Sequence, residues 1–166
     1  MKMRSNNCWR RRALRALPLM LLCAWPAAAQ ISQVLSVKAP PKAVAPRGQS
    51  FTVPVEIVLT AGYHVNSHAP ADDFLIPLRL SWDETFLKVE EVIYPKPESR
   101  KYPFSEKPIQ VYTGDFTIQT RFHAPTQAAP GMKVVTGKLR YQACNDKMCL
   151  PPRVAEIRLP VEVRAK

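Results

Sequence analysis

Apolar and polar residues alternate over several short stretches of this chain. From residue 51 to residue 59, every second side chain is large and apolar, which is the period of a β-strand with one buried face. The same alternation returns over residues 116–122 and 157–163. Shorter apolar runs occupy residues 76–82, 87–94, 109–112 and 134–141. The pattern predicts a chain of short strands, because no long segment carries the 3.6-residue period of a helix.

The residues between these stretches also favour an all-β fold. Fifteen of the 17 prolines follow residue 29, and proline disrupts helix interiors. About seven short strands separated by Pro, Gly and Asp turns predict a single immunoglobulin-like β-sandwich, with a β-barrel as the alternative. Pro54 cannot donate a hydrogen bond to a neighbouring strand, so the strand at residues 51–59 should have a free edge there.

Two other segments are less regular. Residues 30–48 are rich in Pro, Ala and Lys, and they predict an initial strand near residues 34–37 followed by a loop. Residues 94–108 contain four prolines, several charges and the aromatic residues Tyr94, Tyr102 and Phe104. This segment is expected to be one long loop, and long loops inside compact domains are often functional.

The N-terminal 29 residues have the pattern of a secretory signal peptide. Six basic residues come first, an apolar stretch follows from Leu17 to Trp25, and small residues end at Ala29. The apolar stretch is shorter than the about 20 residues that span a bilayer. We therefore expect cleavage near Ala29 and an exported, for example periplasmic, domain of residues 30–166 without a transmembrane segment. Cys23 faintly resembles a lipoprotein cysteine, but Leu22 before it does not suit lipidation.

The charge of the exported part is modest. The six leader cations have no acidic counterpart, so removal of the leader lowers the formal net charge from +11 to +5. The remaining Lys and Arg residues are interspersed with the 13 acidic residues and form no basic run. This distribution is typical of solvated faces and argues against nucleic-acid binding, although it suits an acidic protein partner.

Cys144 and Cys149 are the only cysteines outside the leader. A disulfide that closes such a short loop stabilises a fold by only ~2 kcal/mol, against ~4.7 kcal/mol for a loop near a hundred residues. A structural disulfide is nonetheless common in exported proteins. The apolar run before Cys144 and the prolines after Cys149 predict a β-hairpin that holds both thiols together. Such a pair suits thiol–disulfide exchange, and Lys147 would favour the thiolate while Asp146 would oppose it.

Metal binding is a second hypothesis for the chemistry of the two cysteines. The candidate ligands beside the two cysteines are His64, His68, His123, Met132 and Met148. Their spacing matches no compact zinc signature, and a loop histidine is more often a surface or hydrogen-bonded residue. We therefore predict no metal and no cofactor.

The cysteine segment resembles the N-terminal periplasmic domain of the thiol:disulfide interchange protein DsbD. Residues 141–144 read Tyr-Gln-Ala-Cys, and residues 149–152 read Cys-Leu-Pro-Pro, as that family's motif does. The likeness extends to Gly-Tyr at residues 62–63 and to the segment from Phe104 to Phe116. One departure is the insert between the cysteines, which has four residues here and five in the family's best-known members.

The resemblance implies an immunoglobulin-like domain that takes electrons from a membrane-embedded or thioredoxin-like reductase. It would pass them to oxidised periplasmic partners of the thioredoxin fold. By position, Cys149 matches the cysteine that forms mixed disulfides, and Cys144 matches the resolving cysteine. Phe104 best matches the aromatic cap over the pair, with Tyr102 as a near competitor, and Tyr63 is expected to line the site. Because the chain stops at Lys166 without a membrane conduit, the electrons are expected from a separate protein.

Besides a metal-handling protein, the sequence leaves two functions of different classes open. The first is a redox relay, a component of protein-disulfide reduction in which Cys144 and Cys149 cycle between dithiol and disulfide. The second is a non-catalytic immunoglobulin-like binding module whose local disulfide only fixes a hairpin. The reduction potential of the pair separates the two.

Overall fold

The computed structural model describes residues 33–165, which contain strands and no helix. The strands are β1 (Leu35–Val37), β2 (Ala43–Pro46), β3 (Gln49–Leu59), β4 (His64–Asn66), β5 (Arg79–Trp82), β6 (Lys88–Ile93), β7 (Glu98–Arg100), β8 (Ile109–Thr113), β9 (Phe116–Ala124), β10 (Gly131–Tyr141), β11 (Ala143–Cys144) and β12 (Arg153–Arg164). None of the described segments is a helix long and apolar enough to cross a membrane.

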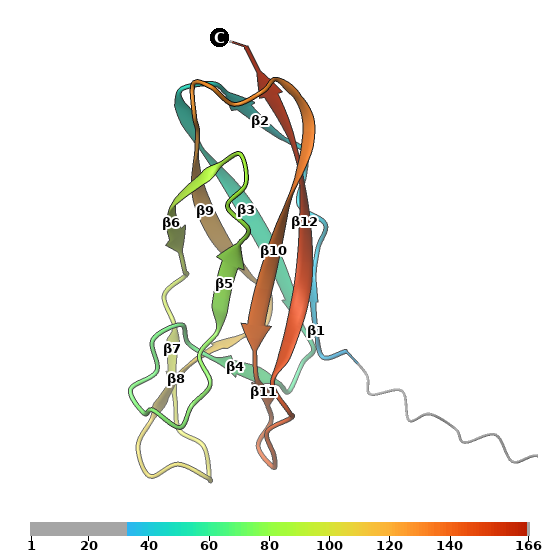
Figure 1. The fold of residues 1–166 in the computed structure, drawn as a ribbon. Helices are drawn as coiled ribbons and strands as arrows, with labels where there is room; N and C mark the ends of the chain where they lie inside the picture. The colour runs from blue at the N-terminus through green and yellow to red at the C-terminus, as the bar shows by residue number, and fades with distance from the viewer. Residues whose placement is uncertain (1–32, 166) are drawn as a thin grey trace, which may run out of the picture. The chain divides into compact units, whose positions relative to one another are not determined.

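The strands form three sheets of four strands each. Two of them, in the orders β1-β3-β9-β6 and β2-β12-β10-β5, make the two layers of the sandwich. The third sheet, β11-β4-β8-β7, lies at one end of these layers (Figure 1). All pairings are antiparallel except the one between β12 and β2. Cys144 lies in the small third sheet and Cys149 pairs with it, so the two large sheets support the part of the fold that holds the cysteines.

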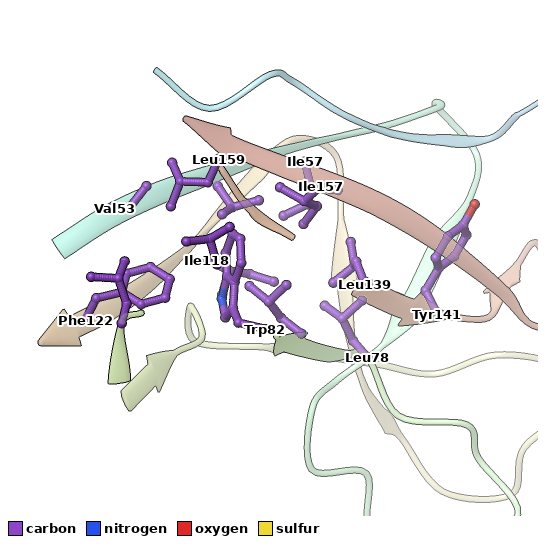
Figure 2. Packing of buried hydrophobic residues seen from close by; sticks show 14 of the residues in the cluster. Val53, Ile57, Leu78, Trp82, Ile118, Phe122, Leu139, Tyr141, Ile157 and Leu159 are labelled. Atoms are coloured by element: carbon purple, nitrogen blue, oxygen red, sulfur yellow. The ribbon is translucent and has the colours of Figure 1, made fainter. Parts of the chain in front are cut away.

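The core lies between the two large sheets. The alternation of apolar and polar residues in the sequence explains which side chains enter it. Along β3, Val53, Val55 and Ile57 are buried while their neighbours Pro54 and Glu56 are exposed. Strands β9, β10 and β12 alternate in the same way. Figure 2 shows side chains from both layers filling the space between them, among them Val53, Ile57, Leu78, Trp82, Ile118, Phe122, Leu139, Ile157 and Leu159.

Trp82 on β5 is the largest side chain of this core. Its ring meets Phe122 edge to face, with 5.2 Å between the ring centroids. The indole N–H donates a hydrogen bond of 3.0 Å to the hydroxyl of Thr120, which is fully buried. The six-membered part of the indole lies over Gly137 of β10, so close that a Cβ atom there would come within 2.7 Å of it. The absence of a side chain at Gly137 therefore makes the room for Trp82.

The predicted immunoglobulin-like sandwich is confirmed, and every strand that alternation predicted is present in the structure. Pro54 has the free edge that was expected, because β1 pairs only with residues 57–59 of β3. The prediction of one uninterrupted loop over residues 94–108 is wrong, since Glu98–Arg100 forms β7 against β8. All three residues of β7 are exposed, so its sequence has no apolar alternation. The predicted signal peptide, residues 1–29, lies outside the described residues.

Candidate functional site

The two cysteines sit on the two arms of a tight hairpin. Cys144 ends β11, and Cys149 pairs with it as an isolated antiparallel bridge. The backbone N–H of Asn145 donates to the carbonyl of Met148, and the side-chain oxygen of Asn145 accepts from the N–H groups of Lys147 and Met148, each at 2.9 Å. Such asparagine side chains replace a backbone partner within a turn. Asn145 therefore shapes the four-residue tip, and the predicted hairpin is present.

The base of the hairpin is also held. The N–H of Leu150 donates to the carbonyl of Ala143 at 2.8 Å, and the side-chain amide of Gln142 donates to the carbonyl of Leu150 at 3.1 Å. Two prolines follow directly, and their rings restrict the exit of the chain. The hairpin thus presents its cysteines from a fixed base.

Cys144 and Cys149 form a disulfide, with 4.0 Å between their Cα atoms. The two residues differ in their access to solvent. Cys144 is 1% exposed, whereas Cys149 is in the exposed class together with the neighbouring residues 146–148 of the tip. A macromolecule that approaches the tip therefore meets Cys149 first.

Aromatic side chains from the loop after β7 lie on the third sheet beside this hairpin. Tyr102 stacks on His64 of β4, with 4.1 Å between ring centroids, and Phe104 stacks on Tyr102 at 5.3 Å. His64 is the cross-strand partner of Cys144. Phe104 is 49% exposed, so it forms the outer layer of the stack and Tyr102 the inner one. Both residues that the sequence proposed as a cap belong to the same stack.

A pocket of about 470 Å³ opens beside this stack. His64 lines it from the start of β4 and Tyr63 from the residue before that strand. Tyr102 lines it from the loop after β7, and Asp146 lines it from the tip of the hairpin. The predicted site residue Tyr63 is therefore brought together with the aromatic stack and the cysteine hairpin.

Comparison with known families identifies this arrangement. The family model described as "Thiol:disulfide interchange protein DsbD, N-terminal" matches residues 32–160. The chain belongs to this DsbD N-terminal family. The match covers most of the chain and includes the cysteine hairpin, the aromatic stack and both large sheets. The resemblance that the sequence indicated is therefore confirmed.

One solved structure supports the fold. The N-terminal periplasmic domain of ScsB from Proteus mirabilis superposes with a TM-score of 0.52 at 13% identity, over 75% of this chain and 44% of that chain. This chain thus spans less than half the length of that structure. The seventh ScaB type I cohesin from Pseudobacteroides cellulosolvens gives a TM-score of 0.45 at 14% identity, over 80% of this chain and 93% of the cohesin. No curated protein matches this chain.

The electrostatics of the DsbD N-terminal site centre on His64. Burial lowers the pKa of His64, and the nearby carboxylate of Asp146 raises it by a smaller amount. The imidazole is therefore neutral at pH 7. Burial also raises the pKa of Tyr102, so its phenol stays protonated at the same pH. The two inner rings, those of His64 and Tyr102, are thus uncharged at pH 7, and the charged residues Asp146, Arg100 and Lys101 line the pocket around them.

Apart from His64, the histidines and methionines considered as metal ligands do not point to a metal site. His68 stacks on Tyr94 at 4.4 Å and lies 2.7 Å from the Tyr112 hydroxyl. His123 lies 3.2 Å from the Ser50 hydroxyl on the outer side of β9. Met132 and Met148 are exposed. Among residues 33–165, no group of three or more His, Cys, Asp or Glu side chains is placed to hold a metal ion.

His64 is the member of the site that sequence reasoning missed, since it was considered only among the possible ligands of a metal that was not predicted. It is 2% exposed, and it joins the cysteine strand to the aromatic stack. The signal in the sequence is weak: His64 follows Gly-Tyr and precedes Val65, at the start of a strand too short to show alternation. Its pairing with Cys144 joins residues 80 positions apart, which no local pattern reveals.

Proposed function

We propose that this chain is an exported thiol–disulfide exchange module. It relays reducing equivalents from a membrane-embedded or thioredoxin-like reductase to oxidised periplasmic proteins of the thioredoxin fold, through Cys144 and Cys149. Membership of the DsbD N-terminal family supports the chemical class. The pattern of residues 1–29, which are removed on export in this proposal, supports the periplasmic location.

The unequal exposure of the two cysteines carries the proposal. Exchange proceeds by attack of a thiolate on a disulfide sulfur, and the attacked sulfur must be reachable. Cys149 is exposed and Cys144 is buried, so an incoming thiolate reaches the sulfur of Cys149. Cys149 is therefore the residue that forms the mixed disulfide, and Cys144 is the resolving residue.

The reductive half of the cycle balances without a cofactor. A thiolate of the reductase attacks the Cys149 sulfur, the Cys144–Cys149 bond breaks, and Cys144 leaves as a thiolate that takes up a proton. The second thiolate of the reductase then attacks its own sulfur in the mixed disulfide, which releases Cys149 as a thiolate. Two electrons have moved to the module, and the reductase holds the new disulfide.

The second half runs the same steps in the opposite direction. The Cys149 thiolate attacks the disulfide of an oxidised partner, and one partner sulfur leaves as a thiolate. Cys144 then attacks the Cys149 sulfur, which restores the Cys144–Cys149 disulfide and releases the other partner thiolate. Both thiolates take up protons from water, and the partner leaves as a dithiol.

Tyr102 and Phe104 act as the cap in this proposal, and Tyr63 lines the site beneath it. A reactive thiolate in an oxidising compartment is lost to further oxidation unless it is shielded. The stack of Phe104 on Tyr102 and of Tyr102 on His64 supports a shield on the side of Cys144, the cross-strand partner of His64, while Cys149 stays open to a partner. Tyr102 forms its inner layer and Phe104 its outer one.

Exchange with a thioredoxin-fold protein tests the proposal directly. The purified protein is reduced, freed of reductant and mixed with oxidised thioredoxin, and free thiols on both proteins are trapped and counted by mass. We expect two thiols on thioredoxin for each disulfide formed at Cys144–Cys149, and the same equilibrium from the opposite mixture. If both proteins keep their starting redox states in both mixtures, the relay is wrong and a structural disulfide in a binding module takes its place.

A further inference from the structure

His64 is a buried titratable residue that the exchange steps above do not use. Its Nε2 atom is buried and has no hydrogen-bond partner within the part of the chain that the structure describes. Buried polar atoms are nearly always paired, because an unpaired one loses its bonds to water without compensation. At a reactive site, an unpaired atom of this kind is free to take a partner in another state of the site.

The geometry points to Cys144 as that partner. His64 and Cys144 are directly opposed across the antiparallel pair β4–β11, so their side chains lie on the same face of the sheet. Cβ atoms of residues opposed in this way are about 4.5–5.5 Å apart. An imidazole nitrogen and a thiol sulfur on such neighbours can come within hydrogen-bond distance. Both residues are buried, at 2% and 1% exposure, so water does not compete.

Reduction changes what Cys144 offers to this nitrogen. In the disulfide the Cys144 sulfur has no hydrogen to donate, whereas the reduced thiol is a donor. Burial disfavours the thiolate that Cys144 must become before it can resolve a mixed disulfide. A neutral imidazole opposite the thiol reduces this cost, since it can take the proton and leave an imidazolium whose charge offsets that of the thiolate.

We propose that His64 is the base that deprotonates Cys144 when the mixed disulfide at Cys149 is resolved. The Cys144 thiol gives its proton to Nε2 of His64, and the thiolate attacks the Cys149 sulfur. The Cys144–Cys149 bond forms, the bond from Cys149 to the partner breaks, and the partner leaves as a thiolate. In the reverse direction, the His64 imidazolium protonates Cys144 as it leaves. The inference rests on exchange at Cys149, which is part of the proposed function.

The other groups around His64 fit this role. Asp146 from the hairpin tip is the carboxylate that stabilises an imidazolium there. Thr113 of β8 opposes His64 on its other side, and its hydroxyl donates to Glu98 of β7. The remaining titratable or charged residues that line the same pocket are Tyr63, Tyr102, Arg100 and Lys101. Because burial lowers the pKa of His64, the imidazole is neutral at pH 7 and can accept a proton.

Ellman's reagent separates the two steps of exchange without any protein partner. With the reduced protein, attack by Cys149 releases one thionitrobenzoate in a second-order phase. Resolution by Cys144 releases the second in a first-order phase. Both phases are followed by stopped-flow absorbance from pH 5.5 to pH 9. In the unaltered protein, we expect the first-order phase to reach its plateau below pH 7.

The variant His64→Gln should slow the first-order phase at pH 7 by about 10²-fold, the usual contribution of a general base. Its pH midpoint should move to about 8.5 or above, as for an unassisted thiol. The second-order phase should change by less than about twofold, because Cys149 is exposed. His64→Phe keeps a flat ring against Tyr102 without a nitrogen, and it should behave like His64→Gln. The matched control, His68→Gln, should leave both phases unchanged.

An unchanged first-order rate and midpoint in both His64 variants would overturn the proposal. A slower phase with an unchanged pH midpoint would overturn it as well, since that result describes a packing role. The outcome is independent of the relay: a protein that shows the His64 effect with Ellman's reagent but exchanges with no thioredoxin-fold protein refutes the proposed function and leaves the role of His64 intact.

Discussion

Replacement of Cys149 by Ser is expected to abolish exchange with thioredoxin-fold proteins, with no mixed disulfide detected by mass. The reason is the position of the two sulfurs. Cys149 is exposed at the tip of the hairpin, whereas Cys144 is 1% exposed beneath it. A partner sulfur must come into bonding contact with the attacked sulfur, and only Cys149 allows this approach.

The variant Cys144→Ser is the matched control, because it also removes the disulfide but keeps the exposed thiol. It should accumulate a stable mixed disulfide with an oxidised partner, since no second thiol resolves it. Thiol trapping followed by mass analysis under non-reducing conditions distinguishes the two variants. An adduct that forms as readily on Cys149→Ser as on Cys144→Ser would show that the roles of the cysteines are assigned wrongly.

Replacement of Trp82 by Ala is expected to lower the free energy of unfolding by about 3–5 kcal/mol, the range for large aromatic residues in cores. The change removes the contact with Phe122, opens the space over Gly137 and leaves the buried hydroxyl of Thr120 without its donor. Domains of this size are stabilised by about 5–15 kcal/mol, so the variant should unfold at much lower urea concentration.

Circular dichroism is the readout for this change, because Trp82 is the only tryptophan after residue 29 and its fluorescence is lost with it. Trp82→Phe is the control: it keeps an apolar ring but loses the hydrogen bond to Thr120, and it should cost less than the alanine variant. A loss below about 1 kcal/mol for Trp82→Ala, the range of surface substitutions, would mean that Trp82 does not organise the core.

The scaffold could be predicted from the sequence because its strands are long and half-buried. In β3, β9 and β12 the apolar period is two over at least nine residues, and burial follows that period. Except for β8, the strands of the third sheet could not be predicted in the same way. The three residues of β4 are all buried and the three of β7 are all exposed, so neither strand alternates. These strands form because longer elements hold their ends in place.

The number of cysteines and the motif around them were enough to predict the chemistry of the site. They were not enough to predict how its residues are arranged in space. The sequence left Phe104 and Tyr102 as competing caps, because a loop has no periodicity that fixes which side chain turns inward. The structure places Tyr102 on His64 and Phe104 on Tyr102, so the alternatives form one stack. The opposition of His64 and Cys144 depends on strand register across the third sheet, and it became visible only in three dimensions.

The reduction potential of Cys144–Cys149 tests the central claim, that this disulfide is exchanged rather than structural. The purified protein is equilibrated with dithiol buffers of defined potential, and free thiols are trapped and counted by mass. A relay requires a midpoint above about −300 mV, where thioredoxin-fold proteins can reduce and reoxidise the pair. A disulfide that stays oxidised in the folded protein well below that potential would contradict the relay and leave the hairpin bridge as a structural element.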